Sequence, residues 1–386
     1  MLFMKKIIAA LICVAAVSLV LVGLSTGVLG DTLSGSQELE QYTIPQSGTG
    51  TGHYRHKYEL LDDVSKQAYA LILDKIEQHP ENIRVPELTN EQLDAVFEAL
   101  SYDNPSLLCM GNGCKLITKG FKSYFVPEYS EDYNTCSVHR THLVTAATAL
   151  RDKAAEYVTS FDRELYVHDY IIENCVYTDN AAHSVNTAYG ALCLGTATCE
   201  GYSRAFQLVM SMLDIDNMLA TGKAADSEGE IQGHMWNIVK IEDAWYYTDL
   251  TWDDPVSDEH VTGHSYFNVP GSMIANTHSE IEPAQIQCTA LDNNYFVRNK
   301  LYFDSASLEF ETRFLAAVAR TRSSGQSSVE VMFSDEYVYE QAKRKMLDEG
   351  LVRTAFELSS IIRKNQSFTM NYSENQQMNT FRLFLK

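Results

Sequence analysis

Residues 196–206, TATCEGYSRAF, place a cysteine in a polar, glycine-flanked setting in front of an apolar helical stripe. Buried structural cysteines usually have apolar neighbours, so Cys199 is a candidate nucleophile, although an ordinary core thiol is the simpler interpretation of the cysteine alone. A helix beginning at Cys199 would offer partial positive charge and N–H donors, which stabilise a thiolate and a developing oxyanion. Thiol catalysis also needs a base and a group that orients the base.

The base candidate is His234, and the orienting candidate is Asp249 on the following predicted strand. If residues 242–243 form a two-residue turn, His234 faces Thr251 across the hairpin and Trp236 faces Asp249. His234 and Asp249 are then diagonal neighbours on one face of the sheet, whereas a shift of one residue would separate them. The spacing therefore permits an imidazole–carboxylate pair.

Together, TCEGYSRAF, GHMWNIV (233–239) and AWYYTDLTWDDP (244–255) resemble the microbial transglutaminase-like superfamily, as does SYFNVPGSMIANTH (265–278). The core of the resemblance covers about residues 160–280. It implies a papain-like fold and acyl transfer through a thioester, with Cys199 as nucleophile, His234 as general base and then acid, and Asp249 as the orienting residue. Such families include peptidases, amidases, transglutaminases and inactive relatives, so the substrate stays open.

Other polar and sulfur-containing residues have simpler interpretations. The adjacent Asp253 and Asp254 are typical of a turn, and metal binding is the minor alternative. Cys109 and Cys114 bracket MGNG, a turn that a local disulfide could close. A zinc site is disfavoured, because the sequence has no second close pair of ligand residues. No motif predicts a cofactor.

The composition and the N-terminal residues limit the class of protein. The 386 residues carry a formal charge of −21, which disfavours nucleic acid as a partner. Lys5 and Lys6 precede an apolar run over residues 7–24, which predicts that residues 1–30 are a signal peptide or a membrane anchor. Seven cysteines follow the leader, and an odd number in an exported protein leaves at least one thiol without an internal partner.

The pattern of elements predicts an α+β fold: a cysteine-bearing helix packed on an antiparallel sheet, with an N-terminal helical layer and a small C-terminal α/β subdomain. The predicted parts are a linker over residues 31–55, a mainly helical region over 56–180, a catalytic core over 160–286 and an α/β appendage over 287–386. Thr89 and Gln92 predict a capping box, Ser334 predicts a helix cap, and NNYFV (293–297) predicts an extended piece.

The predicted function is an exported, thiol-dependent enzyme that cleaves amide or peptide bonds. The expected partner is a protein or peptide substrate, with cell-wall and surface peptides among the candidates. We expect contact with a membrane only through an uncleaved leader. The alternatives are a transglutaminase, in which an amine replaces water, and an inactive surface binding module.

Overall fold

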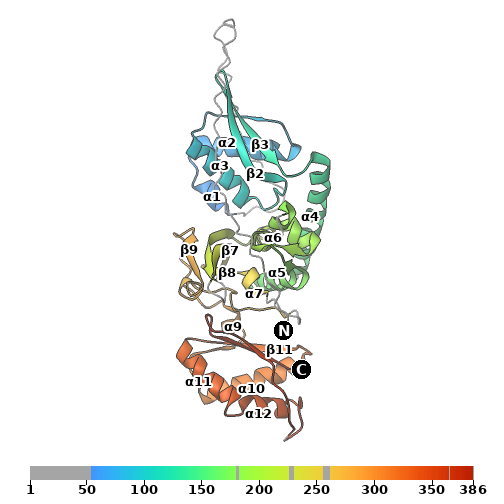
Figure 1. Ribbon diagram of the computed structural model, residues 1–386, viewed down its shortest axis with the longest axis vertical. Helices are drawn as coiled ribbons and strands as arrows, with labels where there is room; N and C mark the ends of the chain where they lie inside the picture. The colour runs from blue at the N-terminus through green and yellow to red at the C-terminus, as the bar shows by residue number, and fades with distance from the viewer. Residues whose placement is uncertain (1–53, 180–181, 226–229, 255–260, 365, 386) are drawn as a thin grey trace. The chain divides into compact units, whose positions relative to one another are not determined.

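The computed structural model describes residues 54–179, 182–225, 230–254, 261–364 and 366–385 (Figure 1). The chain divides into two compact units. The first contains Met1–Thr221 and Gln232–Ile238, and the second contains Gly222–Ile231 and Val239–Lys386. The predicted leader and nearly all of the predicted linker lie outside the described residues. Within the described ranges, no helix combines the length and apolar character needed to cross a membrane.

The first unit begins with helices packed on a small sheet of order β1-β3-β2. Its elements are α1 (His56–Glu59), α2 (Asp63–Lys75), η1 (Ile76–Gln78), β1 (Ile83–Val85), α3 (Asn90–Asp103), β2 (Met110–Lys119) and β3 (Lys122–Tyr129). The predicted capping box is present: the Thr89 hydroxyl accepts from the Gln92 N–H, and the Gln92 side chain accepts from the Thr89 N–H. Gly120 adopts φ 61° in the β2–β3 turn, where a side chain would be strained.

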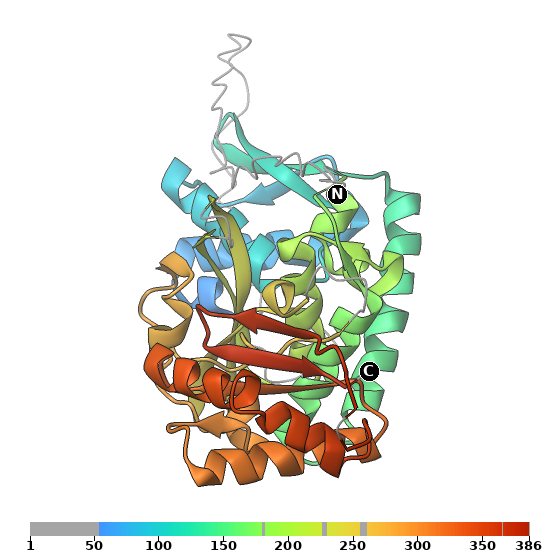
Figure 2. The same ribbon diagram turned by 60° about the horizontal axis from the view of Figure 1, so that its bottom comes forward.

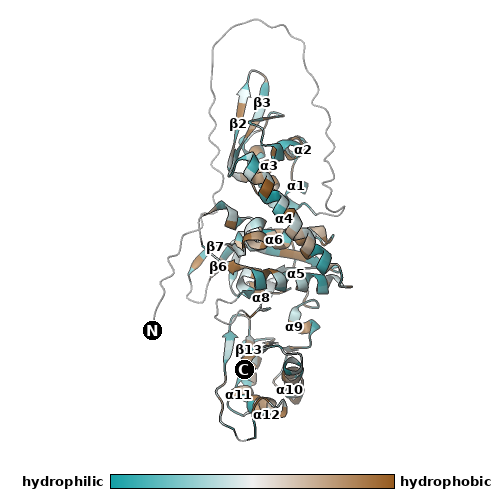
Figure 3. Cartoon of the chain, turned by 90° about the vertical axis from the view of Figure 1, so that its right-hand side faces the viewer, coloured by the Kyte–Doolittle hydropathy of each residue, from teal (hydrophilic) through white to brown (hydrophobic). Residues whose placement is uncertain are grey.

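Three longer helices follow, and they carry the predicted nucleophile. They are α4 (Tyr133–Ala154), α5 (Ser160–Asn174) and α6 (Cys199–Met212), and the short elements β4 (Val176–Tyr177), η2 (His183–Asn186), η3 (Gly190–Leu194) and β5 (Thr196–Ala197) lie between α5 and α6. Figure 1 shows α4 running beside α5 and α6, and Figure 3 shows polar and apolar residues interspersed along α4. Asp132 and Thr159 cap α4 and α5, because each side chain accepts N–H groups of the first turn.

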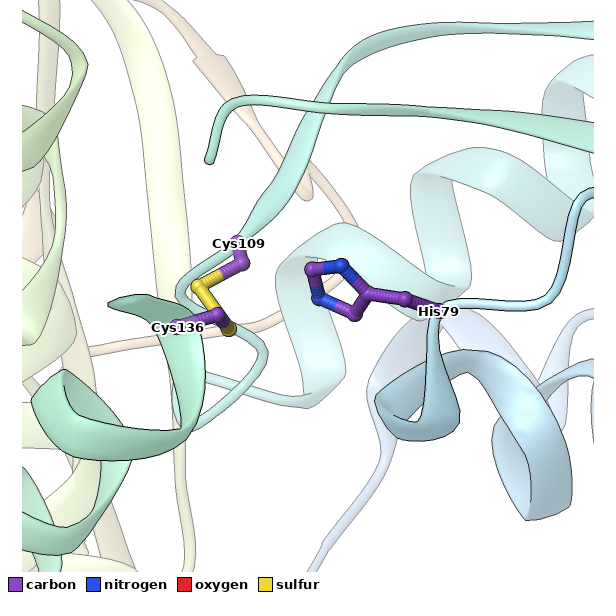
Figure 4. A group of neighbouring side chains, drawn as sticks. All are labelled: His79, Cys109 and Cys136. Atoms are coloured by element: carbon purple, nitrogen blue, oxygen red, sulfur yellow. A yellow bond between two sulfur atoms is a disulfide. The ribbon is translucent and has the colours of Figure 1, made fainter. Parts of the chain in front are cut away.

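Cys109 forms a disulfide with Cys136, at the start of α4, so the alternative of a local Cys109–Cys114 bridge is wrong. The two bonded cysteines are 27 residues apart, a pairing set by tertiary packing that the MGNG turn could not indicate. Figure 4 shows the His79 imidazole pointing toward this disulfide. These three residues could otherwise form a metal-ligand group, but both sulfurs are already bonded to each other.

A four-stranded sheet of order β8-β7-β6-β9 follows α6. Its strands are β6 (Asn217–Ala225), β7 (Ile231–Ile241), β8 (Ala244–Thr248) and β9 (His278–Glu282). The predicted two-residue turn between β7 and β8 is confirmed, because only Glu242 and Asp243 separate the two strands and Glu242 takes up φ 56°. Helix α7 (Leu250–Asp253) comes directly after β8.

The C-terminal part of the second unit has three main helices against a sheet of order β10-β11-β13-β12 (Figure 2). Its elements are α8 (Gly271–Ile274), α9 (Tyr295–Arg298), β10 (Tyr302–Phe303), α10 (Leu308–Ser323), β11 (Ser328–Phe333), α11 (Glu336–Leu347), α12 (Leu351–Leu358), β12 (Tyr372–Asn375) and β13 (Thr380–Phe384). Phe296, Phe310, Phe314, Phe333 and Phe381 belong to its buried core.

Two local predictions in this part are wrong. NNYFV is not extended, because the Asn294 side chain accepts the Phe296 N–H and begins α9. The cap of α11 is Asp335 rather than Ser334, since the Asp335 carboxylate accepts the Val338 N–H at 2.9 Å. In both cases a polar side chain accepts an N–H group of the first turn, and this local hydrogen bond decides where the helix begins.

Candidate active site

Cys199 is the first residue of α6, as predicted from the sequence. The chain enters the helix through Gly195, at φ 67°, and through Thr198 in an extended conformation. The Thr198 hydroxyl does not cap the helix; it donates to Asn186 Oδ1 at 2.9 Å. Within the described part of the chain, Thr198 therefore gives α6 no side-chain cap. N–H groups at the start of a helix have no partner inside the helix.

Gly201 lets the first turn of α6 pack directly against the chain at Val185. A Cβ atom at position 201 would lie 2.3 Å from the Val185 carbonyl oxygen, so only glycine fits. The same carbonyl accepts the Thr198 N–H at 3.0 Å. These two contacts fix the helix start and with it the position of Cys199.

Cys199 lies in a small apolar cluster, and the residue is 4% exposed. Leu219 and Met235 belong to the same cluster, and the half-buried Tyr102 packs against it. The Ser203 hydroxyl lies 2.8 Å from the Cys199 carbonyl oxygen and 3.0 Å from that of Met235. The first turn of α6 is thereby held against β7.

His234 is on β7, directly before Met235, and belongs to the same unit as Cys199. It is buried, and its ring stacks on Trp236 with 5.7 Å between the centroids. Asn237, three residues further along β7, donates from Nδ2 to the Ser203 carbonyl at 3.0 Å. Contacts on the C-terminal side of His234 therefore join its strand to the nucleophile helix.

Asp249 lies in the second unit, and the prediction that it is a strand residue is wrong. Strand β8 ends at Thr248, and Asp249 is the N-cap of α7. Its Oδ1 accepts the N–H groups of Thr251 at 3.0 Å and Trp252 at 3.2 Å. Local side-chain bonds of this kind compete with the strand ladder, which explains why the strand ends one residue earlier.

His278 is the residue that the sequence reasoning missed. Its Nε2 lies 3.1 Å from Asp249 Oδ2, and its Nδ1 lies 2.8 Å from the Thr277 hydroxyl. Both Asp249 and His278 are buried, and the Trp252 ring lies 4.9 Å from the His278 ring. The sequence did point to this region, since His278 ends the stretch SYFNVPGSMIANTH that contributes to the family resemblance. No spacing argument linked His278 to Asp249.

Three other free thiols have raised pKa values. Burial raises the pKa of Cys114 and of Cys288 to about 12, and it also raises the pKa of Cys193. Because the thiolate is the nucleophilic form, these three groups are poor nucleophiles at neutral pH.

Comparison with known proteins agrees with the predicted resemblance. Residues 146–250 match the model of the Transglutaminase-like superfamily, so the chain contains a transglutaminase-like domain that includes Cys199, His234 and Asp249. Among solved structures, the chain is similar to one described as a "Putative Cysteine Protease from Cytophaga hutchinsonii", with 14% identity, 28% of this chain and 37% of that chain covered, and a TM-score of 0.25.

The chain is also similar to a structure described as a TGase, with 16% identity and a TM-score of 0.26. That match covers 45% of this chain and 50% of the other, so the chain spans half or less of the length of both structures. No curated protein matches the chain.

Proposed function

We propose, from the transglutaminase-like domain at residues 146–250, that this chain is a thiol-dependent acyl-transfer enzyme that cleaves amide bonds. The observation that carries the proposal is the position of Cys199, the first residue of an uncapped helix whose first turn is held against the strand of His234. In this proposal Cys199 is the nucleophile, His234 is the base and Asp249 orients the His234 ring.

The proposed reaction has two halves. The Cys199 thiol gives its proton to His234, and the thiolate attacks the amide carbon to form a carbon–sulfur bond. The carbon–nitrogen bond then breaks, and His234 returns the proton to the departing amine. In the second half, water loses a proton to His234 and attacks the thioester. The carbon–sulfur bond breaks and a carboxylic acid is released. The proton held by His234 returns to the Cys199 sulfur and restores the thiol.

The same thioester can react with an amine instead of water, which would make the enzyme a transglutaminase. We expect the enzyme to hydrolyse a blocked glutaminyl-glycine dipeptide and casein in water. The products measured are ammonia and new amino termini. With hydroxylamine present, some of the acyl group should appear as hydroxamate, measured by mass spectrometry. Incorporation of a labelled amine in excess over hydrolysis would identify a transglutaminase. An intact, monodisperse protein that converts neither compound in either assay would instead favour an inactive binding module.

The environment of Asp249 supports a positioning role for His278. We expect His278→Ala to lower kcat/KM by about 10–100-fold, as is typical when the partner of a site residue is removed. Without the contact from Nε2, Asp249 would hold the His234 imidazolium less well. The acid limb of the pH–rate profile should therefore move to lower pH. His278→Gln keeps a donor near the position of Nε2 and should restore the profile. An alanine variant with lower activity but an unshifted profile would indicate a structural role only.

We further propose that the enzyme acts outside the cytoplasm on a protein or peptide. The basic, apolar N-terminus supports export, as does the Cys109–Cys136 disulfide, since disulfides persist mainly in oxidising compartments.

A further inference from the structure

The β2–β3 hairpin of the first unit carries positive charge on one face. The pairing of the two strands places Lys119 directly opposite Lys122, and Ile117 opposite Tyr124. Strand β1 adds Arg84, which pairs with Tyr124 from the other side of β3. Cross-strand partners share a face of the sheet, as do residues two apart along a strand. This face therefore gathers four cations: Arg84, Lys115, Lys119 and Lys122.

The opposite face of the same strands is turned to the core. Phe125 and Ser123 are buried, and Leu116 packs against the core cluster that contains Phe125. Lys119 and Lys122 are exposed, so the cationic face is the solvent side of the sheet. Figures 1 and 3 show the hairpin extending beyond α2 and α3, which leaves its tip accessible to a large partner.

Acidic residues do not balance the charge at the end of the hairpin. No aspartate or glutamate occurs between Asp103 and Glu128, although acidic residues outnumber basic ones by 51 to 30 in the whole chain. Lys115 forms an exposed ion pair with Glu128 at 3.7 Å, but neither Lys119 nor Lys122 has an acidic partner within the described part of the chain. Like charges directly opposite each other destabilise a strand pair. An anionic ligand at this position would remove that repulsion.

The tip of the hairpin adds an apolar group to the charge. Gly120 and Phe121 form the two-residue turn between the paired lysines, and the Phe121 side chain is fully exposed. Turns usually carry small or polar residues, so an exposed aromatic ring there has no local structural role. At a membrane surface, such a ring can enter the boundary between headgroups and acyl chains while the flanking ammonium groups stay with the headgroup phosphates.

We propose that the tip of the β2–β3 hairpin docks on the surface of an anionic phospholipid bilayer, an inference that is independent of the proposed function. The exposed ring and the like-charged lysines together favour a bilayer over a soluble anion, which would use the charge alone. The net charge of −21 does not prevent docking, because charges farther away than about 10 Å are largely screened at about 0.1 M salt. Membrane contact then extends beyond the predicted leader.

The test measures amide hydrogen exchange of the full-length protein, by mass spectrometry of peptides that contain the hairpin tip. The protein is mixed with vesicles of phosphatidylcholine alone, or of equal parts of phosphatidylcholine and phosphatidylglycerol. This local measurement is valid whether or not a leader anchors the chain. We expect only the mixed vesicles to slow exchange at Gly120 and Phe121, by at least about fivefold, and about 1 M salt to abolish the effect.

Two variants of the tip separate its charge from its ring. Lys119→Gln/Lys122→Gln should lose most of the protection, because each lysine near an anionic surface contributes about fivefold to binding. Phe121→Ala should lose at least about half of the protection, because the apolar contact with the bilayer is removed. Unchanged protection in either variant would contradict the proposal.

Matched variants elsewhere in the first unit serve as controls. Lys75→Gln/Lys153→Gln changes the net charge equally at two exposed lysines outside the hairpin, and Val158→Ala shortens another exposed apolar side chain. Both should keep full protection. Equal exchange with the two kinds of vesicle would overturn the proposal, as would an equal loss in the controls. It would also be overturned if soluble polyglutamate protected the wild-type and Phe121→Ala tips as well as the mixed vesicles do, which would indicate a soluble acidic polymer as the partner.

Discussion

Replacing Cys199 with alanine is expected to lower both hydrolysis and hydroxamate formation by at least about 10³-fold, because the proposed thioester forms on the Cys199 sulfur. The loss should appear in kcat/KM for the blocked glutaminyl dipeptide and for casein. Cys199→Ser should also be severely impaired, since a hydroxyl is far harder to ionise than a thiol. Circular dichroism and size-exclusion chromatography would show whether each variant keeps its fold.

Cys288→Ala is the matched control for this experiment. Cys288 is similarly buried, but it lies in the second unit and its pKa is raised by burial to about 12. The control variant should therefore keep most of its activity. If Cys199→Ala were folded and fully active, Cys199 could not be the nucleophile, and the proposed mechanism would be wrong.

The second large effect is expected at a buried ion pair in the C-terminal sheet. Glu330 on β11 is the cross-strand partner of Arg382 on β13, and Arg382 Nη2 lies 3.0 Å from Glu330 Oε2. Arg382 also donates to the carbonyl groups of Val261 and Thr262, and the Ser265 hydroxyl donates to Glu330 Oε1. Removing one partner would leave an uncompensated charge among these groups.

We expect Arg382→Met to destabilise this part of the second unit by about 3–5 kcal/mol, the usual cost of breaking a buried pair. Glu330→Gln should also be destabilising. The double variant Glu330→Leu/Arg382→Met should recover much of the loss, because it leaves no charge unpaired. Hydrogen exchange of the β11 and β13 amides measures this region directly. A single variant with unchanged exchange would contradict the expectation.

The Glu330–Arg382 pair also predicts that the stability of this part of the second unit depends on pH. Burial opposes ionisation of Glu330, but the charge of Arg382 and the contact with His264 outweigh burial and lower the pKa to about 2. The folded state therefore binds the proton less readily than the unfolded state. The stabilising contribution is complete above the ordinary pKa of 4.5 and is lost as pH falls through about 2. In the Glu330→Gln variant, this acid-dependent change should disappear from the hydrogen exchange of the β11 and β13 amides.

Local chemistry explains which features could be predicted from the sequence. The capping box at Thr89 and Gln92 and the two-residue turn at 242–243 each depend on residues close in the chain. Their hydrogen bonds or backbone angles are satisfied locally, so a short stretch of sequence contains the information.

Tertiary contacts and side-chain orientation account for the features that could not be predicted. Cys109 pairs with Cys136 because β2 and α4 start close together, and nothing in the nearby MGNG turn indicates this. Asp249 could continue a strand or cap a helix, and the N–H groups of α7 decide the outcome. His278 meets Asp249 across 29 residues of chain. In each case the deciding partner is distant in sequence or depends on side-chain orientation.

The most direct test of the central claim is the alkylation rate of each cysteine in the folded protein at pH 7. Iodoacetamide labelling followed by peptide mass spectrometry resolves the individual sites. We predict that Cys199 reacts at least about tenfold faster than Cys114, Cys193 and Cys288, that His234→Ala slows it, and that the rates converge in urea. A folded protein whose Cys199 is not labelled, and which reacts there only after unfolding and at the rate of the other thiols, would contradict the claim that Cys199 is an activated nucleophile.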